Sequence, residues 1–218
     1  MLKAVLFDMD GVIVDTEPLH CKAYYKMFTA VNIAVSEELY ESFTGQSTIS
    51  ICRQLCDLFH LSESPETLVQ LKRDFFRDLF FNDDSLTLID GVLELIIEYH
   101  KNGLTLVLAS SASMITITNV FNRFDLDKYF IVKLSGADLK ASKPHPEIFL
   151  KAAQASGFKK EECMVIEDST NGIAAAHAAG IFCVGFQSPN SKNQVYDQAD
   201  LVISSFEEIG YEKVIGER

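Results

Sequence analysis

The sequence has few positive charges for its length. Its 218 residues include 19 lysines and arginines against 31 aspartates and glutamates, which gives a formal net charge of −12. Nucleic acids and anionic membranes bind to basic surfaces, so this balance argues against both as partners. If the substrate is an anion, a local positive charge inside an acidic protein has to meet it.

Long apolar runs and a regular cysteine pattern are also lacking. No apolar stretch in the sequence approaches the ~18 residues that span a bilayer, and the first residues do not have the charged and then apolar pattern of a signal peptide. The five cysteines stand at irregular spacings, which do not suggest a disulfide framework. We therefore expect a cytoplasmic protein without a membrane partner and, by default, a monomer.

Cys52, Cys56 and His60 are spaced four residues apart on an expected helix. This stripe could in principle present soft metal ligands. A straight helix cannot converge such a stripe on one tetrahedral ion, so we expect a packed helix face instead of a zinc site.

The first strand ends in two carboxylates. The apolar run 5–7 is followed by Asp8 and Asp10, and Gly11 allows a sharp turn just beyond them. Ligands of open parallel α/β sheets bind beyond the carboxyl ends of the strands. Two carboxylates so close together repel unless they share a cation or a proton, and Mg²⁺ is the usual partner. The alternative is an ordinary turn in which an aspartate closes the strand.

The remaining pattern divides the chain into two kinds of region. Residues 16–81 show only helical periodicity, whereas helices and strands alternate from residue 92 to the C-terminus. Such alternation predicts parallel βαβ units. The expected fold class is therefore α/β, with a Rossmann-like doubly wound parallel sheet core and an inserted all-helical cap domain. The expected bounds are 1–15 plus 88–218 for the core and 16–87 for the cap; the later strands are expected at 104–109, 164–166, 182–184 and 201–203.

Three further polar groups follow or lie between the later strands. Ser110 and Ser111 end one strand, where a hydroxyl and backbone N–H groups at a helix start can cradle a phosphate, although a helix cap is the alternative. Glu167 and Asp168 end another strand. One acidic residue there could be a helix cap, but two consecutive carboxylates after an apolar strand are costly without a cation, which favours metal ligation. Lys143 lies between these segments and could reach inward as a positive charge, although most lysines are simply exposed.

Taken in chain order, these motifs resemble those of the haloacid dehalogenase-like superfamily of phosphotransferases. The resemblance runs over residues 2–186 and rests on Asp8-Met9-Asp10-Gly11-Val12, Ser110, Lys143-Pro144 and Glu167-Asp168. The helical insert resembles the small cap of the β-phosphoglucomutase-like phosphatases. Within that cap, Thr16 and His20 fit the hinge of the subgroup.

This resemblance implies a catalytic role for each acidic residue. Asp8 would attack phosphorus and become an aspartyl phosphate, and Asp10 would act as general acid and then general base. Mg²⁺ would be held by Asp8, the main-chain carbonyl of Asp10 and Asp168. Glu167 would be a direct or an outer ligand of the same ion.

It also implies how the substrate is held. Ser110, the Ser111 N–H and Lys143 would stabilise the transferring phosphoryl oxygens. The cap would close over the site and present specificity residues from the loop that contains Gly45 and Gln46. The expected partner is a small phosphorylated metabolite.

Two cap positions bear on the reaction type. The β-phosphoglucomutases place an arginine in the cap loop, where this chain has Thr48, which cannot supply a bidentate clamp for a second phosphate. They also have a cap lysine, for which Lys72, Arg73 and Asp74 are the candidates here. His20 favours the mutases, and the alternative is a histidine that only packs its helix. We therefore expect a Mg²⁺-dependent phosphatase for a small, sugar phosphate-like monoester, with a β-phosphoglucomutase-type mutase as the alternative.

Two other functions fit less well. A dehalogenase would leave Asp10 and the second acidic pair without a phosphate or a metal to serve. A receiver domain, a phospho-acceptor signalling module, also combines an acidic cluster with Ser or Thr, Lys and an acceptor aspartate. Its acceptor, however, lies well inside the chain and it has no helical insert, whereas Asp8 ends the first strand.

Overall fold

The chain folds into two compact units in a computed structural model. The structure describes residues 1–43, 46, 48–83, 86–188 and 193–216. Met1–Asp15 and Thr87–Arg218 form the first unit, and Thr16–Leu86 form the second. We call them the sheet unit and the helical unit and describe each by itself.

The sheet unit contains a parallel sheet of six strands in its described residues. The strand order is β3-β2-β1-β4-β5-β6, so the chain extends outward from β1 in both directions. This topology confirms the predicted doubly wound sheet. The strands are β1 (Ala4–Phe7), β2 (Thr105–Ser110), β3 (Phe130–Ser135), β4 (Cys163–Glu167), β5 (Phe182–Phe186) and β6 (Leu201–Ile203).

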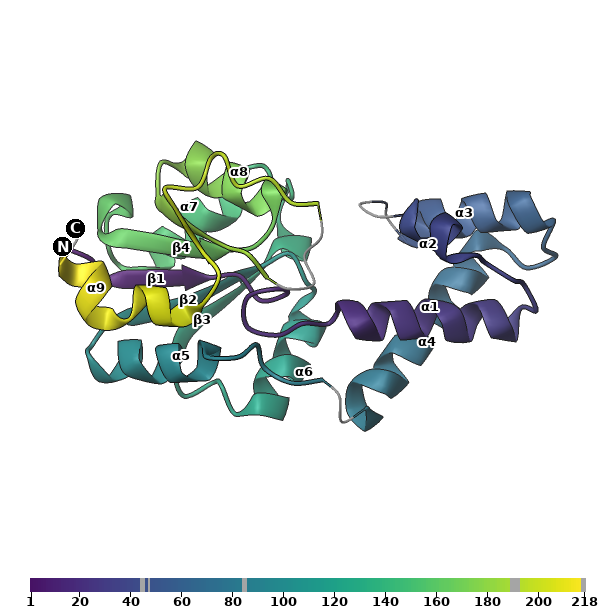
Figure 1. Ribbon diagram of the computed structural model, residues 1–218, viewed down its shortest axis with the longest axis horizontal. Coiled ribbons are helices and arrows are strands. Elements are labelled where there is room, and N and C mark those ends of the chain that lie inside the picture. Colours follow the sequence, from purple (N-terminus) through teal and green to yellow (C-terminus); the bar gives the residue numbers. More distant parts are fainter. Residues whose placement is uncertain (44–45, 47, 84–85, 189–192, 217–218) are drawn as a thin grey trace. The chain divides into compact units, whose positions relative to one another are not determined.

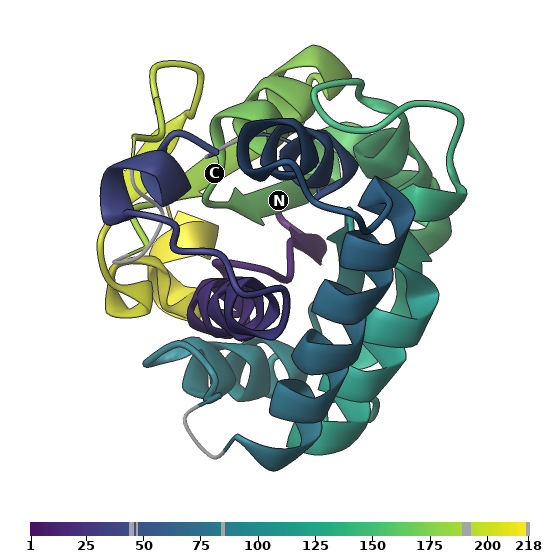
Figure 2. The same cartoon turned by 90° about the vertical axis from the view of Figure 1, so that its right-hand side faces the viewer.

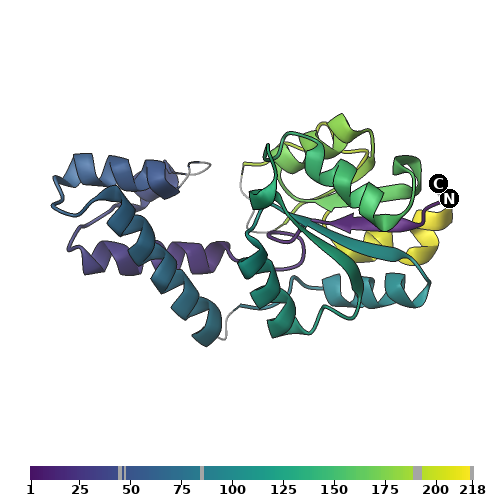
Figure 3. The same cartoon turned by 180° about the vertical axis from the view of Figure 1, so that it is seen from behind.

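Helices cover both faces of this sheet. Figures 1 and 3 show α7 and α8 on one face and α5 and α9 on the other. Side chains of β1 alternate between the faces: Leu6 joins the core cluster beneath α7 and α8, whereas Phe7 contacts Tyr99 of α5. The helices of this unit are α5 (Val92–Lys101), α6 (Met114–Phe124), α7 (Glu147–Ser156), α8 (Thr170–Ala179) and α9 (Tyr211–Gly216), with short 3-10 turns at Gly136–Asp138, Lys160–Glu162 and Phe206–Ile209.

Strand β3 was not predicted from the sequence. It lies at the edge of the sheet and pairs only with β2 in the observed strand order. Ile131 is 59% exposed, and the strand also carries Lys133. An edge strand that is half exposed does not give the continuous apolar run of a central strand.

The helical unit is formed by four helices in its described part. They are α1 (Glu17–Ala30), α2 (Glu37–Glu41), α3 (Thr48–Phe59) and α4 (Pro65–Asn82). Figure 2 looks nearly along α1 and α3, and α4 packs against both of them. Met27, Leu55 and Leu68 lie in the shared apolar core. Helix α4 begins where the Ser64 hydroxyl accepts a hydrogen bond from the Thr67 N–H (3.2 Å).

The cysteine stripe of α3 is a packed face, as predicted. Cys52 is fully buried in the core of the helical unit. The Cys56 thiol donates to the Glu63 carbonyl (3.5 Å), and His60 is exposed just beyond the helix. Nowhere in the described chain is a helix long and apolar enough to cross a membrane.

Candidate active site

Three carboxylates meet where β1 and β4 end. The two strands are neighbours, with Phe7 paired to Ile166, and the Asp8 N–H donates to the Ile166 carbonyl (3.0 Å). Asp8, Glu167 and Asp168 are all buried, and one carboxylate oxygen from each lies within 4.8 Å of the others. At this point the strand order reverses, which is where doubly wound sheets bind their ligands.

Two glycines allow these carboxylates to approach the backbone. A Cβ on Gly11 would lie 2.0 Å from Oδ2 of Asp168, and the φ of Gly11 is +84°, which also favours glycine. A Cβ on Gly172 would lie 1.7 Å from Oε1 of Glu167. The turn after β1 and the first turn of α8 therefore lie directly against the acidic pair that follows β4.

Lys143 is the cation of this cluster. Its Nζ lies 2.5 Å from Oδ1 of Asp8 and 2.8 Å from Oε1 of Glu167, and its side chain is 6% exposed. The same Nζ lies 4.8 Å from the ring centroid of Phe149. The structure thus places Lys143 inside the sheet unit, not among solvated surface lysines.

The charges in this cluster depend on one another. Burial raises the pKa of the Asp8 carboxyl well above its usual range; Lys143 lowers that pKa, whereas Glu167 and Asp168 raise it again. Burial by itself lowers the pKa of Lys143, but the carboxylates of Asp8 and Glu167 raise it above the ordinary value. Lys143 therefore stays protonated, and Asp8 needs positive charge nearby to ionise.

Glu167 already has partners for both of its oxygens. Oε1 accepts from Lys143, while Oε2 accepts from the N–H (2.6 Å) and the hydroxyl (3.0 Å) of Ser169. Through these bonds, Glu167 fixes the position of the Lys143 ammonium and of the loop before α8. Asp8 and Asp168 supply the other oxygens of the cluster, and such a hard, anionic oxygen set fits Mg²⁺.

Asp10 lies in the turn that follows Asp8. The turn is closed by a hydrogen bond from the Gly11 N–H to the Val14 carbonyl (2.8 Å), and Asp10 is partly exposed. Among the described residues, the side chain of Asp10 is not part of the three-carboxylate cluster. Its predicted metal contact uses the main-chain carbonyl and stays a prediction.

For the segment after β2, the sequence left open whether Ser110 and Ser111 cap a helix or bind a phosphate. Ser113 caps α6, because its hydroxyl accepts from the Thr116 N–H (3.3 Å). Ser110 is 1% exposed, and its hydroxyl accepts from the Ala112 N–H (3.1 Å). As the acceptor in that bond, Ser110 keeps its own proton for another oxygen. Ser111 follows directly and is exposed.

His20 belongs to a buried pair within the helical unit. Its Nδ1 lies 2.6 Å from Nζ of Lys72, and its ring stacks on Phe76 with a centroid distance of 4.2 Å. Nζ of Lys72 also lies 5.0 Å from the ring centroid of Tyr24. Of the three candidates for the cap lysine, Lys72 is therefore the one that contacts His20.

Burial changes the charge of this pair. Burial, with a smaller effect from the Lys72 charge, lowers the pKa of His20 to about 3. Burial also lowers the pKa of Lys72 to about 8, although Glu17 and Cys52 raise it in part. An ammonium group can only donate, so a charged Lys72 fixes the acceptor at Nδ1 and the imidazole proton at Nε2.

The other predicted residues of the helical unit vary in placement. Thr16 is buried at the start of α1, and its side chain makes no capping hydrogen bond. Gln46 is exposed, and its side-chain oxygen accepts from the Ser50 hydroxyl (3.3 Å) and from the Gln54 amide. Gly45 lies outside the described residues.

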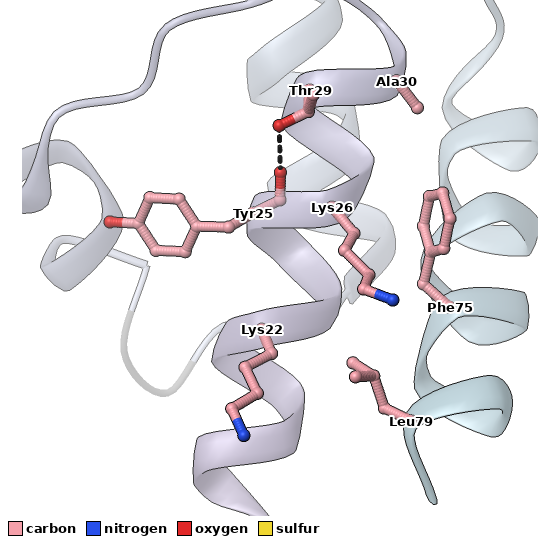
Figure 4. A pocket seen from close by; sticks show the side chains of 7 residues that line it. All are labelled: Lys22, Tyr25, Lys26, Thr29, Ala30, Phe75 and Leu79. Atoms are coloured by element: carbon pink, nitrogen blue, oxygen red, sulfur yellow. Dashed lines mark hydrogen bonds between the residues drawn. The ribbon is translucent and has the colours of Figure 1, made fainter. Parts of the chain in front are cut away.

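An apolar groove between α1 and α4 is a separate feature of the helical unit. Figure 4 shows Lys22 and Lys26 on α1 and Phe75 and Leu79 on α4, among the residues that line it. Both lysines have carboxylate partners, since Lys22 lies 2.6 Å from Asp83 and Lys26 lies 3.7 Å from Asp78. The seven described residues of its lining include none of the predicted site residues.

Comparison with known proteins identifies the family. A family model described as haloacid dehalogenase-like hydrolase matches residues 5–186, and the chain belongs to this family. It is therefore an enzyme of the phosphohydrolase and phosphotransferase class, not a receiver domain.

Several relatives cover nearly the whole chain or most of it. A phosphorylated carbohydrates phosphatase of Thermotoga maritima is 31% identical over 83% of this chain and 82% of its own length. Hexitol phosphatase B of Escherichia coli is 28% identical over 98% of this chain and 96% of its own length. The crystal structure of a putative β-phosphoglucomutase from Thermotoga maritima is 30% identical, covers 99% of both chains and has a TM-score of 0.86.

Three supporting residues of the site were not singled out from the sequence. Ser169 holds Glu167, Gly172 leaves room for the Glu167 carboxylate, and Phe149 lies against the Lys143 ammonium. Ser169 and Gly172 directly follow the acidic pair in the chain, so their position was a usable signal. No sequence signal marks Phe149, because it resembles any other apolar residue of α7.

Proposed function

We propose that the chain is a Mg²⁺-dependent phosphatase that hydrolyses a small sugar phosphate through an aspartyl phosphate on Asp8. The observation that carries this proposal is the buried contact of Lys143 with Asp8 and Glu167 at the switch point of the sheet. This contact brings together a carboxylate that can act as nucleophile, a fixed cation and oxygen atoms suited to a hard metal ion.

In the first step, an ionised oxygen of Asp8 attacks the phosphorus atom of the substrate. The bond between phosphorus and the sugar oxygen breaks, and Asp10 donates a proton to that leaving oxygen. Ser110 and the Ser111 N–H donate to the phosphoryl oxygens, and Lys143 balances their charge. The products of this step are the free sugar hydroxyl and a phosphorylated Asp8.

In the second step, a water molecule attacks the phosphorus atom of the aspartyl phosphate. Asp10, now ionised, takes a proton from the water, and the bond between phosphorus and Asp8 breaks. Inorganic phosphate leaves, and both aspartates return to their starting states. The two steps divide one difficult displacement into two easier ones.

The residues that would hold Mg²⁺ are Asp8, Asp168 and the main-chain carbonyl of Asp10. Glu167 would act from outside this set, because its two oxygens bond to Lys143 and Ser169. When bound, the ion supplies positive charge to the phosphoryl oxygens and favours the ionised form of Asp8.

The substrate class rests on the relatives. The phosphatases of Thermotoga maritima and Escherichia coli described above act, by their names, on phosphorylated carbohydrates and hexitol phosphates. We assign substrate recognition to the helical unit, with Thr16, His20, Gly45 and Gln46 as its contact residues. His20 would present an Nε2–H donor, which suits a hydroxyl or phosphate oxygen of the substrate.

A β-phosphoglucomutase-type mutase is the second candidate. The pairing of His20 with Lys72 favours it, because both are features of the mutase cap in the resemblance described above. Thr48 at the position of the clamping arginine argues for the phosphatase, since a hydroxyl cannot hold a second phosphate as a guanidinium does.

The test is phosphate release from a panel of sugar phosphates, with and without Mg²⁺, beside a coupled assay for conversion of β-glucose 1-phosphate to glucose 6-phosphate. We expect catalytic, metal-dependent release that is abolished in Asp8→Asn and unchanged in Asp90→Asn, an exposed aspartate of the same unit. Ordinary release by Asp8→Asn would overturn the proposal. Formation of glucose 6-phosphate without net release would establish the mutase instead.

A further inference from the structure

Ser135, the last residue of β3, is a buried serine whose hydroxyl bonds to another segment of the chain. It is 4% exposed, and its hydroxyl donates to the Ala112 carbonyl (2.9 Å). Ser110 and Ser135 are register partners at the ends of β2 and β3. The edge strand thus reaches across to the segment that carries the candidate phosphate-binding serines.

Ala112 is held from both sides as a result. Its N–H donates to the Ser110 hydroxyl (3.1 Å), and its carbonyl accepts from the Ser135 hydroxyl. These two groups belong to the peptide units on either side of the Ala112 Cα, so the two bonds together restrict both backbone dihedrals of that residue. The orientation of the Ala112 N–H in turn determines where the Ser110 hydroxyl can direct its remaining proton.

The residue after Ser135 brings the backbone equally close. A Cβ on Gly136 would lie 3.1 Å from the Ser111 Cα and 3.2 Å from the Ser110 carbonyl oxygen. The end of β3 therefore lies directly against residues 110–111. A displacement of Ser135 would be transmitted to this segment because no gap separates them.

We propose that Ser135 is a positioning residue for phosphoryl binding, which acts through Ala112 on the hydroxyl of Ser110. This inference rests on the proposed role of Ser110 in holding the phosphoryl group. Ser135 itself touches the loop and not the reacting atoms. Its removal should loosen the donor geometry while the nucleophile and the carboxylate cluster stay in place.

The experiment compares Ser135→Ala with Ser156→Ala, and the probe is inorganic phosphate as a competitive inhibitor. Ser156 is a matched control, because it is also a buried serine of the sheet unit whose hydroxyl donates to a carbonyl, that of Ala153 (2.7 Å). We expect Ser135→Ala to raise the inhibition constant for phosphate and the KM by roughly three- to tenfold, the effect of one hydrogen bond. In Ser156→Ala both should stay within about twofold of wild type, although both variants lose some thermal stability.

A double-mutant cycle with Ser110→Ala tests the route of the effect. If Ser135 acts through Ser110, Ser135→Ala should raise the inhibition constant by less than about twofold when Ser110 is already alanine. An equal increase in both backgrounds would overturn the proposal, and so would equal inhibition constants for Ser135→Ala and Ser156→Ala.

Failure of this inference can be told apart from failure of the proposed function. If wild type does not bind phosphate and does not hydrolyse any sugar phosphate, the proposed function fails. If wild type does both and Ser110→Ala weakens phosphate binding, while Ser135→Ala behaves as the control does, only the role of Ser135 fails.

Discussion

Among the described residues, each unit has a buried lysine, and the pKa values of the two lysines are shifted in opposite directions. Lys143 in the sheet unit lies between the carboxylates of Asp8 and Glu167, whereas Lys72 in the helical unit lies against the neutral Nδ1 of His20. Burial lowers the pKa of both ammonium groups. The carboxylates reverse this for Lys143, but the pKa of Lys72 stays lowered, at about 8.

The comparison shows that the partner, not burial alone, decides the direction in which the pKa of a buried lysine shifts. Aromatic rings also lie near each ammonium, with Phe149 beside Lys143 and Tyr24 and Phe76 beside Lys72. The rings therefore do not explain the difference. A fixed cation suits a site where negative charge develops on a phosphoryl group, whereas a lysine with a pKa of about 8 suits a hydrogen-bonding role.

The largest effect is expected for Lys143→Met. This change leaves two buried carboxylates without their cation, so we expect turnover to fall by about 100- to 1,000-fold and unfolding free energy at pH 8 to fall by about 3–5 kcal/mol. Phosphate release with Mg²⁺ present measures turnover, and urea unfolding with a chelator in place of Mg²⁺ measures the free energy of unfolding. Lys3→Met, which breaks an exposed pair with Glu162, should change little. If Lys143→Met were as stable and active as Lys3→Met, the contrast between the lysines would fail.

Gly172→Ala perturbs the same pair without removing a charge. A Cβ at this position would lie 1.7 Å from Oε1 of Glu167, the oxygen that contacts Lys143, so this carboxylate has to shift. We expect a loss of about 1–3 kcal/mol of stability from overpacking, with a clear fall in kcat. The matched control is Gly216→Ala, because no atom of the described residues lies within 4 Å of a Cβ there. Normal kcat in Gly172→Ala would mean that the contact of Glu167 with Lys143 is dispensable.

A smaller effect, with a defined pH dependence, is expected for Lys72→Met. The pKa of Lys72 is about 8 in the folded protein and 10.5 ordinarily, so between these values the unfolded chain binds more protons and stability rises with pH. Relative to Lys72→Met, wild type should gain about 1 kcal/mol of unfolding free energy from pH 7 to pH 9. Chemical unfolding of both proteins at the two pH values measures this. A parallel pH dependence would show that Lys72 has an ordinary pKa.

The smallest signal is expected from the His20 imidazole. Its pKa is lowered to about 3 from an ordinary 6.5, so its NMR resonances should show no imidazole protonation with a midpoint near pH 6.5. The stability that depends on a neutral His20 is complete above pH 6.5 and is lost as the pH falls toward 3. Its ¹⁵N shifts should show the proton on Nε2. A titration of His20 near pH 6.5 would contradict the burial of the pair.

The strands were predictable to the extent that each forms a continuous apolar run in the sequence. β1, β2, β4 and β5 give continuous apolar runs, which is why the alternation of helices and strands was visible. β3 was missed because an exposed edge strand does not need such a run. That omission matters for the site, since β3 carries Ser135 to the loop after β2.

The sequence alone determined which chemical groups are present and in which order they follow the strands. It placed Asp8, Lys143, Glu167 and Asp168 near the expected edge of the sheet, because a parallel sheet brings the carboxyl ends of its strands together. Only the tertiary structure decided the charges and partners of the two lysines. Lys143 is 135 residues from Asp8 in the chain, and Lys72 is 52 residues from His20. Local sequence around a lysine does not specify a partner so far away, yet that partner determines its pKa.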